Sequence, residues 1–145
     1  MIDESAAKHL FTIGYGGRPP ADFLRLLQDH GVVTIVDVRL RPEHAYLSAY
    51  AKAKTSDKGI EQLLANANIG YVSFPELGNL FLGWDDWQKP YRQLLAQSGD
   101  LLTQRLHTVP RPFCLLCAEK QVGDCHRCLI AEHLARAGWQ ATHLL

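Results

Sequence analysis

The sequence predicts a single three-layer α/β domain, residues 1–145, with a mainly parallel sheet of about five strands flanked by helices. Short apolar segments rich in β-branched residues alternate with segments of helical periodicity. A strand, a helix and a strand fit within the first forty or so residues, on the scale of a βαβ unit of roughly thirty. The second strand, "VVTIVDVR", is almost wholly apolar, as expected of a strand buried on both faces. This alternation is typical of α/β domains.

The first half of the chain supplies two strands, one helix and a long loop. "HLFTIGYGG" is an apolar strand that ends in glycines. "RPPADFLRLLQDHG" predicts a helix, because Pro20 suits a first helical turn and Gly31 suits a helix end. Residues 32–39 form the second strand. Residues 39–58 show no clear period, and long loops of this kind are usually functional or mobile.

The second half continues the alternation. Residues 59–78 predict a helix, a strand and a turn, and residues 79–109 predict a loop and a long helix. A strand over 111–119, a helix over 124–138 and a final strand over 139–145 complete the chain. Asp85 or Asp86 is the expected N-cap of the long helix, and Asp124 that of the last helix.

Composition narrows the functional classes. Lys+Arg and Asp+Glu both number 15, so any attraction to nucleic acid must come from a local patch. Hydrophobic residues make up 47%, the level of an ordinary globular protein. No apolar run of about 18 residues exists, and the first residues do not resemble a signal peptide. We therefore expect a cytoplasmic protein with no membrane partner.

Polar residues follow the predicted strands. Ligands of parallel sheets bind beyond the carboxyl ends of the strands. We therefore expect one site at that edge, built from residues of separate segments: Gly14, Tyr15, Asp37, Arg39, Asn79, Cys117, Glu119, Cys125, His126 and Arg127.

The four cysteines allow a zinc site, but their context disfavours it. Cys114, Cys117, Cys125 and Cys128 have the spacing C-x2-C-x7-C-x2-C, which resembles a four-thiolate pattern. Residues three apart on a strand point to opposite faces, so Cys114 and Cys117 should not share a metal. We predict no metal site and no cofactor. In a chain without an export signal, we expect thiols rather than a disulfide framework.

Cys125 could instead be a nucleophile. It lies near a predicted helix N-terminus beside His126 and Arg127, which would lower the pKa of its thiol. The alternative is a small side chain that packs the turn, and the residues leave both interpretations open.

The carboxylates offer a third chemistry. Asp37 and Glu119 both end apolar strands, where burial raises a carboxyl pKa and a nearby arginine lowers it. Structural alternatives are a salt bridge from Asp37 to Arg39 or Arg127, and capping of a turn by Glu119. Convergence of the two acids with His126 and Arg127 favours a functional site.

The loop over residues 39–58 is the basic part of the chain. It contains five basic residues and two acids: Arg39, Arg41, Lys52, Lys54 and Lys58 against Glu43 and Asp57. We expect Arg41, Lys52 and Lys54 to contact a nucleic-acid backbone. Tyr15, Tyr46 and Tyr50 flank basic residues and are candidates for stacking on a base.

Four stretches together resemble a known family. "FTIGYGG", "FLRLLQDHGVVTIVDVRLRP", "YVSFPELGN" and "LLCAEKQVGDCHRCLIAEHL" are similar in order and spacing to domain of unknown function 488. The matching positions are Gly14, Asp37, Arg39, Pro42, Leu77, Gly78, Cys117, Glu119, Cys125, His126 and Arg127. Cys114 and Cys128 are not part of that pattern, and Asn79 stands where a second glycine is usual.

The resemblance implies DNA chemistry. DNA glycosylase activity on 5-substituted uracil, such as 5-hydroxymethyluracil, has been attributed to members of this family. Asp37 and Glu119 would then act in cleaving the N-glycosidic bond, with Asp37 favoured as the stabiliser of positive charge on the sugar. Gly14, Tyr15, Asn79, Cys125 and His126 would bind the extruded base. Arg39 and Arg127 would hold the phosphates of DNA that contains the modified base.

Two other functions remain open. The same arginines and tyrosines would serve a non-catalytic nucleotide or nucleic-acid binding module, and Cys125 could carry a different enzymatic reaction. Lys52, Lys54 and Lys120 also leave room for a lyase step after base release.

Overall fold

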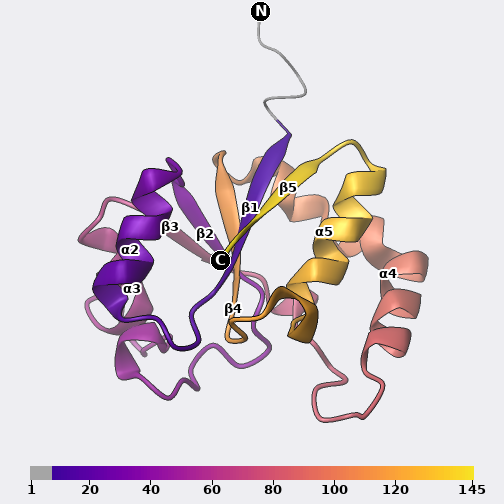
Figure 1. The fold of residues 1–145 in the computed structure, drawn as a ribbon, viewed down its shortest axis with the longest axis horizontal. Coiled ribbons are helices and arrows are strands. Elements are labelled where there is room, and N and C mark those ends of the chain that lie inside the picture. Colours follow the sequence, from indigo (N-terminus) through magenta and orange to yellow (C-terminus); the bar gives the residue numbers. More distant parts are fainter. Residues whose placement is uncertain (1–7) are drawn as a thin grey trace, which may run out of the picture.

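The computed structural model describes residues 8–145, which form one parallel sheet of five strands covered by helices on both faces (Figure 1). The strands are β1 His9–Gly14, β2 Thr34–Asp37, β3 Gly70–Ser73, β4 Phe113–Cys117 and β5 Gln140–Leu144. Their order in the sheet is β3-β2-β4-β1-β5, and every neighbouring pair is parallel. The predicted α/β fold with about five strands is confirmed.

Four α-helices connect the strands: α2 Pro20–Asp29, α3 Gly59–Ala65, α4 Gln88–Leu102 and α5 Arg127–Arg136. Short 3-10 turns lie between them, over Ser48–Tyr50, Pro75–Leu77, Gln104–Thr108 and Val122–Asp124. The expected caps of the last two helices are wrong. Trp87 precedes α4 and His126 precedes α5, and neither makes a side-chain cap hydrogen bond. Asp124 lies in the preceding 3-10 turn, and extended backbone at Cys125 separates that turn from the helix.

Strand order explains which helix covers which face. The chain moves from β1 to β2 and β3 in one direction across the sheet, then returns to β4 and β5 in the other. Right-handed crossovers therefore place α2 and α3 on one face and α4 and α5 on the opposite face. Phe23 and Leu27 of α2 pack in one core cluster, whereas Leu129 and Ile130 of α5 pack in the other. Figure 1 shows these two helical layers on either side of the sheet.

Central strand β4 is buried along its whole length and contributes to both clusters. Cys114 and Leu116 face the cluster under α2 and α3, while Leu115 and Cys117 face the cluster under α4 and α5. Cys114 and Cys117 therefore lie on opposite faces, as predicted, and the four cysteines do not gather at one point. Among residues 8–145 there is no group of three or more metal-ligating side chains.

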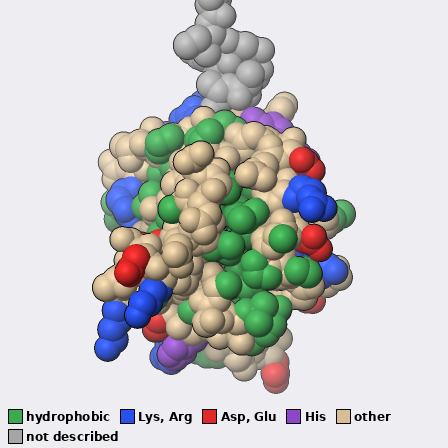
Figure 2. Space-filling view, turned by 90° about the vertical axis from the view of Figure 1, so that its left-hand side faces the viewer, with side chains coloured by type: hydrophobic (Ala, Val, Ile, Leu, Met, Phe, Trp, Pro, Cys, Tyr) green, Lys and Arg blue, Asp and Glu red, His purple; other side chains and the backbone are tan. Residues whose placement is uncertain are grey.

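Charge on the surface is mixed. On the face seen in Figure 2, hydrophobic side chains form a band, and charged side chains of both signs lie at its margins. Within the described part of the chain, no helix is long and apolar enough to cross a membrane.

Candidate functional site

A cavity of about 540 Å³ opens at the carboxyl ends of β2 and β4. Its walls come from the segment after β2, the segment after the 3-10 turn Pro75–Leu77, the end of β4 and the residues just before α5. The lining residues are Arg39, Leu40, Arg41, His44, Asn79, Leu80, Leu82, Cys117, Ala118, Glu119, Asp124, Cys125 and His126. Its volume lies within the usual range for small-molecule pockets, which is roughly 300–1,000 Å³. Residues that follow β2, β3 and β4 therefore meet at this cavity, whereas Gly14 and Tyr15 at the end of β1 do not line it.

Asp37 and Arg39 form a buried ion pair at the end of β2. Asp37 is fully buried, and its Oδ1 accepts hydrogen bonds from Arg39 N at 3.1 Å and Nε at 2.9 Å. Its Oδ2 accepts from Arg39 Nη2 at 2.7 Å and from the hydroxyl of Tyr71 at 2.5 Å. With four bonds to two oxygens, the carboxylate is saturated, and Asp37 is not among the cavity-lining residues.

Electrostatics within this pair follow from burial and contact. Burial acts to lower the pKa of Arg39, but the hydrogen bond and negative charge of Asp37 outweigh it, so the pKa of Arg39 is raised. Burial, followed by the charge of Asp37, raises the pKa of Tyr71. Tyr71 therefore remains a neutral donor to a charged pair.

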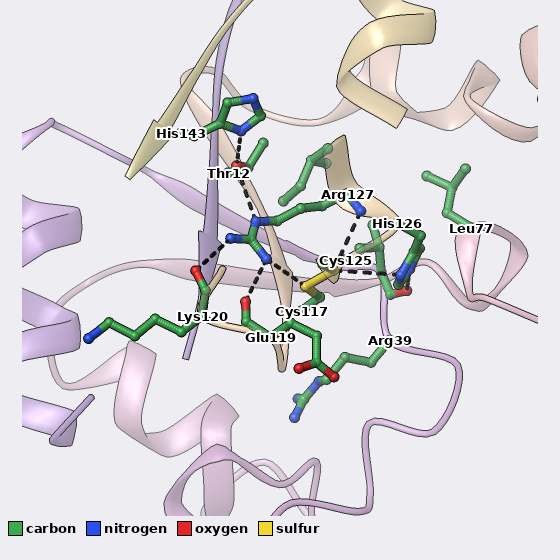
Figure 3. The surroundings of a disulfide bond; sticks show 12 residues. Thr12, Arg39, Leu77, Cys117, Glu119, Lys120, Cys125, His126, Arg127 and His143 are labelled. Carbon is green, nitrogen blue, oxygen red and sulfur yellow. Dashed lines mark hydrogen bonds between the residues drawn. A yellow bond between two sulfur atoms is a disulfide. The ribbon is translucent and has the colours of Figure 1, made fainter. Parts of the chain in front are cut away.

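Glu119 is the acid of the predicted pair that lines the cavity. It follows β4, is exposed, and lines the same cavity as Arg39. Figure 3 shows its side chain. In the part of the chain that the structure describes, its carboxylate forms no hydrogen bond and no ion pair within 4.0 Å. Asp37 and Glu119 were expected to act together, but only Glu119 can contact a ligand directly.

Cys117 and Cys125 form a disulfide bond on the cavity wall, which corrects the expectation of free thiols (Figure 3). Cys114 and Cys128 are the free cysteines. Since a disulfide sulfur is not a nucleophilic thiolate, Cys125 in this state has no free thiol for covalent catalysis.

His126 joins the two strand ends across the cavity. Its Nε2 lies 2.7 Å from the carbonyl oxygen of Val38, and its Nδ1 lies 3.6 Å from the Cys125 sulfur. Burial lowers the pKa of His126 to about 4, partly opposed by the Val38 carbonyl. At neutral pH the imidazole is therefore uncharged, and the contact with Val38 assigns its proton to Nε2.

Arg127 is fully buried and does not line the cavity. Its guanidinium instead holds the loop that carries Glu119. Nη1 donates to the Glu119 carbonyl at 2.6 Å and contacts the Cys117 sulfur at 2.9 Å. Nη2 donates to the Lys120 carbonyl, and Nε to Thr12 Oγ1 (Figure 3). Within residues 8–145, no carboxylate lies within 4.0 Å of this guanidinium, and burial lowers its pKa. The expected phosphate contact is therefore not accessible in this structure.

Gly14 and Tyr15 lie behind the cavity rather than in it. A Cβ at Gly14 would stand 1.7 Å from the Glu119 carbonyl oxygen, so glycine allows the end of β1 to approach this loop. Tyr15 is 4% exposed and stacks on Tyr50, with ring centroids 4.5 Å apart. A base cannot stack on Tyr15 unless the segment moves.

The predicted backbone-binding residues differ in accessibility. Arg41 is exposed and lines the cavity. Lys52 is partly buried, lies 3.5 Å from a Glu61 carboxylate oxygen and donates to the Ala53 carbonyl. Lys54 is exposed and has no such partner among the described residues.

Sequence reasoning missed part of the site. Leu80 and Leu82, which are 65% and 70% exposed, form an apolar rim beside Asn79, whose Oδ1 accepts from the Phe81 amide. The apolar run that directly follows Asn79 was the feature of the sequence that could have indicated these two leucines. The partnership of Tyr71 with Asp37 depends on the register of β3 against β2, for which the sequence carries no direct signal.

Comparison with protein families gives one match. The model described as "Domain of unknown function DUF488" matches residues 19–134. No curated protein and no solved structure matched the chain.

Proposed function

Since the chain belongs to the family described as domain of unknown function DUF488, a family whose description states no activity, we propose the function from the cavity. We propose that the protein is a DNA glycosylase that removes a 5-substituted uracil, such as 5-hydroxymethyluracil, from DNA. The exposed Glu119 carboxylate on the wall of a cavity large enough to hold a base is the observation that carries this proposal.

Glu119 has the chemistry that N-glycosidic hydrolysis needs. The bond between C1′ of the sugar and the base nitrogen breaks with its electron pair moving to the base, and positive charge develops on the sugar. A carboxylate beside C1′ stabilises that charge or accepts a proton from the attacking water. The water oxygen bonds to C1′, and the base leaves with a proton. Glu119 is assigned this role because its carboxylate is free to contact substrate.

Asp37 receives a different role from the one expected. All of its acceptor bonds serve Arg39 and Tyr71, so we assign it to positioning Arg39 rather than to stabilising the sugar. Asn79 and Arg39 supply polar groups for the base, and Arg41 and Lys54 supply cations for the DNA backbone. Base flipping into the cavity brings the glycosidic bond to Glu119.

Single-turnover base release from a duplex with one 5-hydroxymethyluracil tests the proposal. Glu119→Gln should slow release by roughly 10²–10⁴-fold, the usual scale for one such group. Cys125→Ser should retain release, and Arg92→Gln, in an exposed ion pair with Glu132, is the matched surface control. Loss of activity in Cys125→Ser but not in Cys117→Ser would indicate thiol chemistry, because both variants break the disulfide and only the first removes the Cys125 sulfur. Binding of the duplex without any base release by the unaltered protein would indicate a non-catalytic module.

A further inference from the structure

One donor of Arg39 has no partner. Nε and Nη2 donate to Asp37, but Nη1 is buried and forms no hydrogen bond within residues 8–145. Arg39 as a whole is 6% exposed and lines the cavity. An unsatisfied buried donor is uncommon in folded proteins, and this one belongs to a residue of the cavity wall. Because Nη1 itself has almost no accessible surface, a ligand acceptor reaches it only when the wall beside Arg39 shifts.

Local charge restricts what this acceptor can be. Asp37 neutralises Arg39 through two direct hydrogen bonds between their side chains. Besides Arg39, the cavity wall carries the cation of Arg41 and the two carboxylates of Glu119 and Asp124, whereas Arg127 is turned away into the protein. A phosphate placed beside Arg39 would therefore meet an already compensated cation in a wall where carboxylates outnumber the remaining arginine. A neutral carbonyl oxygen accepts the hydrogen bond without this repulsion.

We propose that Arg39 Nη1 is the specificity-determining donor of the cavity and recognises a carbonyl oxygen of an uncharged base edge. The inference rests on the proposed function for the identity of the ligand, which is a uracil-type base. The base edge of uracil presents a carbonyl at the position where cytosine presents an amino group. Arg39 selects the uracil carbonyl, because a cytosine amino group facing Nη1 would place two hydrogen-bond donors in contact with no acceptor between them.

Arginine makes this selection one-directional. A guanidinium has only donors and keeps its proton in proteins, whereas an asparagine or glutamine amide can rotate to present either a donor or an acceptor. Asp37 and Tyr71 are positioning residues, because two hydrogen bonds from the guanidinium to Asp37 fix its plane and the direction of Nη1, and a hydrogen bond from Tyr71 holds the Asp37 carboxylate in place. Tyr71→Phe removes one of these bonds without changing the charge of the pair.

Direct binding to the intact protein tests the inference without requiring catalysis. Titrations followed by NMR would compare 5-hydroxymethyl-2′-deoxyuridine, 5-hydroxymethyl-2′-deoxycytidine and inorganic phosphate. The uridine should bind about 10- to 100-fold more tightly than the cytidine, the scale expected when a buried donor is left unpaired. Equal affinities, or phosphate that displaces the uridine from the cavity, would overturn the inference.

Variants then separate recognition from stability. Arg39→Lys keeps the positive charge opposite Asp37 but loses the planar guanidinium that pairs with Asp37 and also presents Nη1. The ratio of the affinities for the uridine and the cytidine should therefore fall to near one. Tyr71→Phe should lower the ratio several-fold, and it carries the test if Arg39→Lys does not fold. Arg92→Gln should keep the wild-type ratio. A Tyr71→Phe protein that folds with an unchanged ratio contradicts the positioning role.

The two proposals fail in different ways. Selective binding of the uridine with no base release from duplex DNA would contradict the glycosylase and leave the recognition by Arg39 standing. Base release with equal rates from 5-hydroxymethyluracil and 5-hydroxymethylcytosine would support the glycosylase and contradict the recognition.

Discussion

Neighbouring strands β2 and β4 each end near an acid and an arginine, yet the two ends are built in opposite ways. At the end of β2, Asp37 is buried and its charge is cancelled by Arg39. After β4, Glu119 is free, and Arg127 binds uncharged carbonyl, hydroxyl and sulfur acceptors instead of a carboxylate. The first arrangement fixes a donor in the cavity wall, and the second holds a loop so that its carboxylate remains available. An acid and an arginine near a strand end therefore do not by themselves indicate a catalytic carboxylate.

Replacing Asp37 and Glu119 one at a time should give the largest difference in the free energy of unfolding. Asp37→Asn should lower the free energy of unfolding by about 3–5 kcal/mol, because it leaves Arg39 buried without a counter-charge. Glu119→Gln should change it by about 0.5 kcal/mol or less, as expected of a surface position. Urea denaturation of both variants measures the difference. A loss below about 1 kcal/mol for Asp37→Asn would show that another group compensates Arg39.

A pH titration sharpens the comparison through His126, which connects the two strand ends. Its folded pKa of about 4 lies below the ordinary value of 6.5, so the unfolded chain binds a proton first as pH falls. Stability due to the neutral imidazole is thus complete above pH 6.5 and is lost progressively as pH falls to about 4. The total loss should be about 3 kcal/mol.

Denaturation of wild type and His126→Gln across this pH range isolates that contribution. Glutamine can retain a donor for the Val38 carbonyl but does not titrate. The pH dependence of the difference in unfolding free energy should therefore follow His126, since the carboxylates common to both proteins cancel. A difference that does not vary between pH 6.5 and 4 would contradict a buried neutral imidazole.

The smallest expected effect concerns the loop that follows β2. Lys54→Gln should reduce the slope of log affinity for DNA against log salt by about 0.9, the value for one phosphate contact. Lys52→Gln should reduce it less, because Glu61 already compensates that lysine. Binding of a duplex at several salt concentrations gives both slopes, and equal changes would show that the Lys52–Glu61 pair opens on DNA.

Much of the fold could be predicted because strands that are buried on both faces of the sheet consist almost entirely of apolar residues. Strand β2 is apolar except at Thr34 and Asp37, and β4 consists of apolar residues and two cysteines. Helix starts were harder, since a 3-10 turn and one extended residue precede α5 and displace its beginning from Asp124 to Arg127. Local capping preferences do not describe such a turn.

For the site, the sequence could predict the edge of the sheet but not the accessibility of each side chain. Six residues of the predicted site line the cavity: Arg39, Asn79, Cys117, Glu119, Cys125 and His126. The other four, Gly14, Tyr15, Asp37 and Arg127, do not line it. Their burial depends on partners from distant segments, such as Tyr71 and Thr12, and hence on strand register and packing that one sequence does not specify.

The disulfide between Cys117 and Cys125 has a consequence for the unfolded chain as well as for the cavity wall. The two cysteines are separated by 8 positions in the sequence, so the bond closes the segment that carries Glu119 into a small ring. A ring has fewer conformations when the protein is unfolded, and the chain-entropy model relates this restriction to a stabilisation of about 2.5 kcal/mol. The same covalent bond therefore limits how far the Glu119 segment can spread even when the sheet around it is lost.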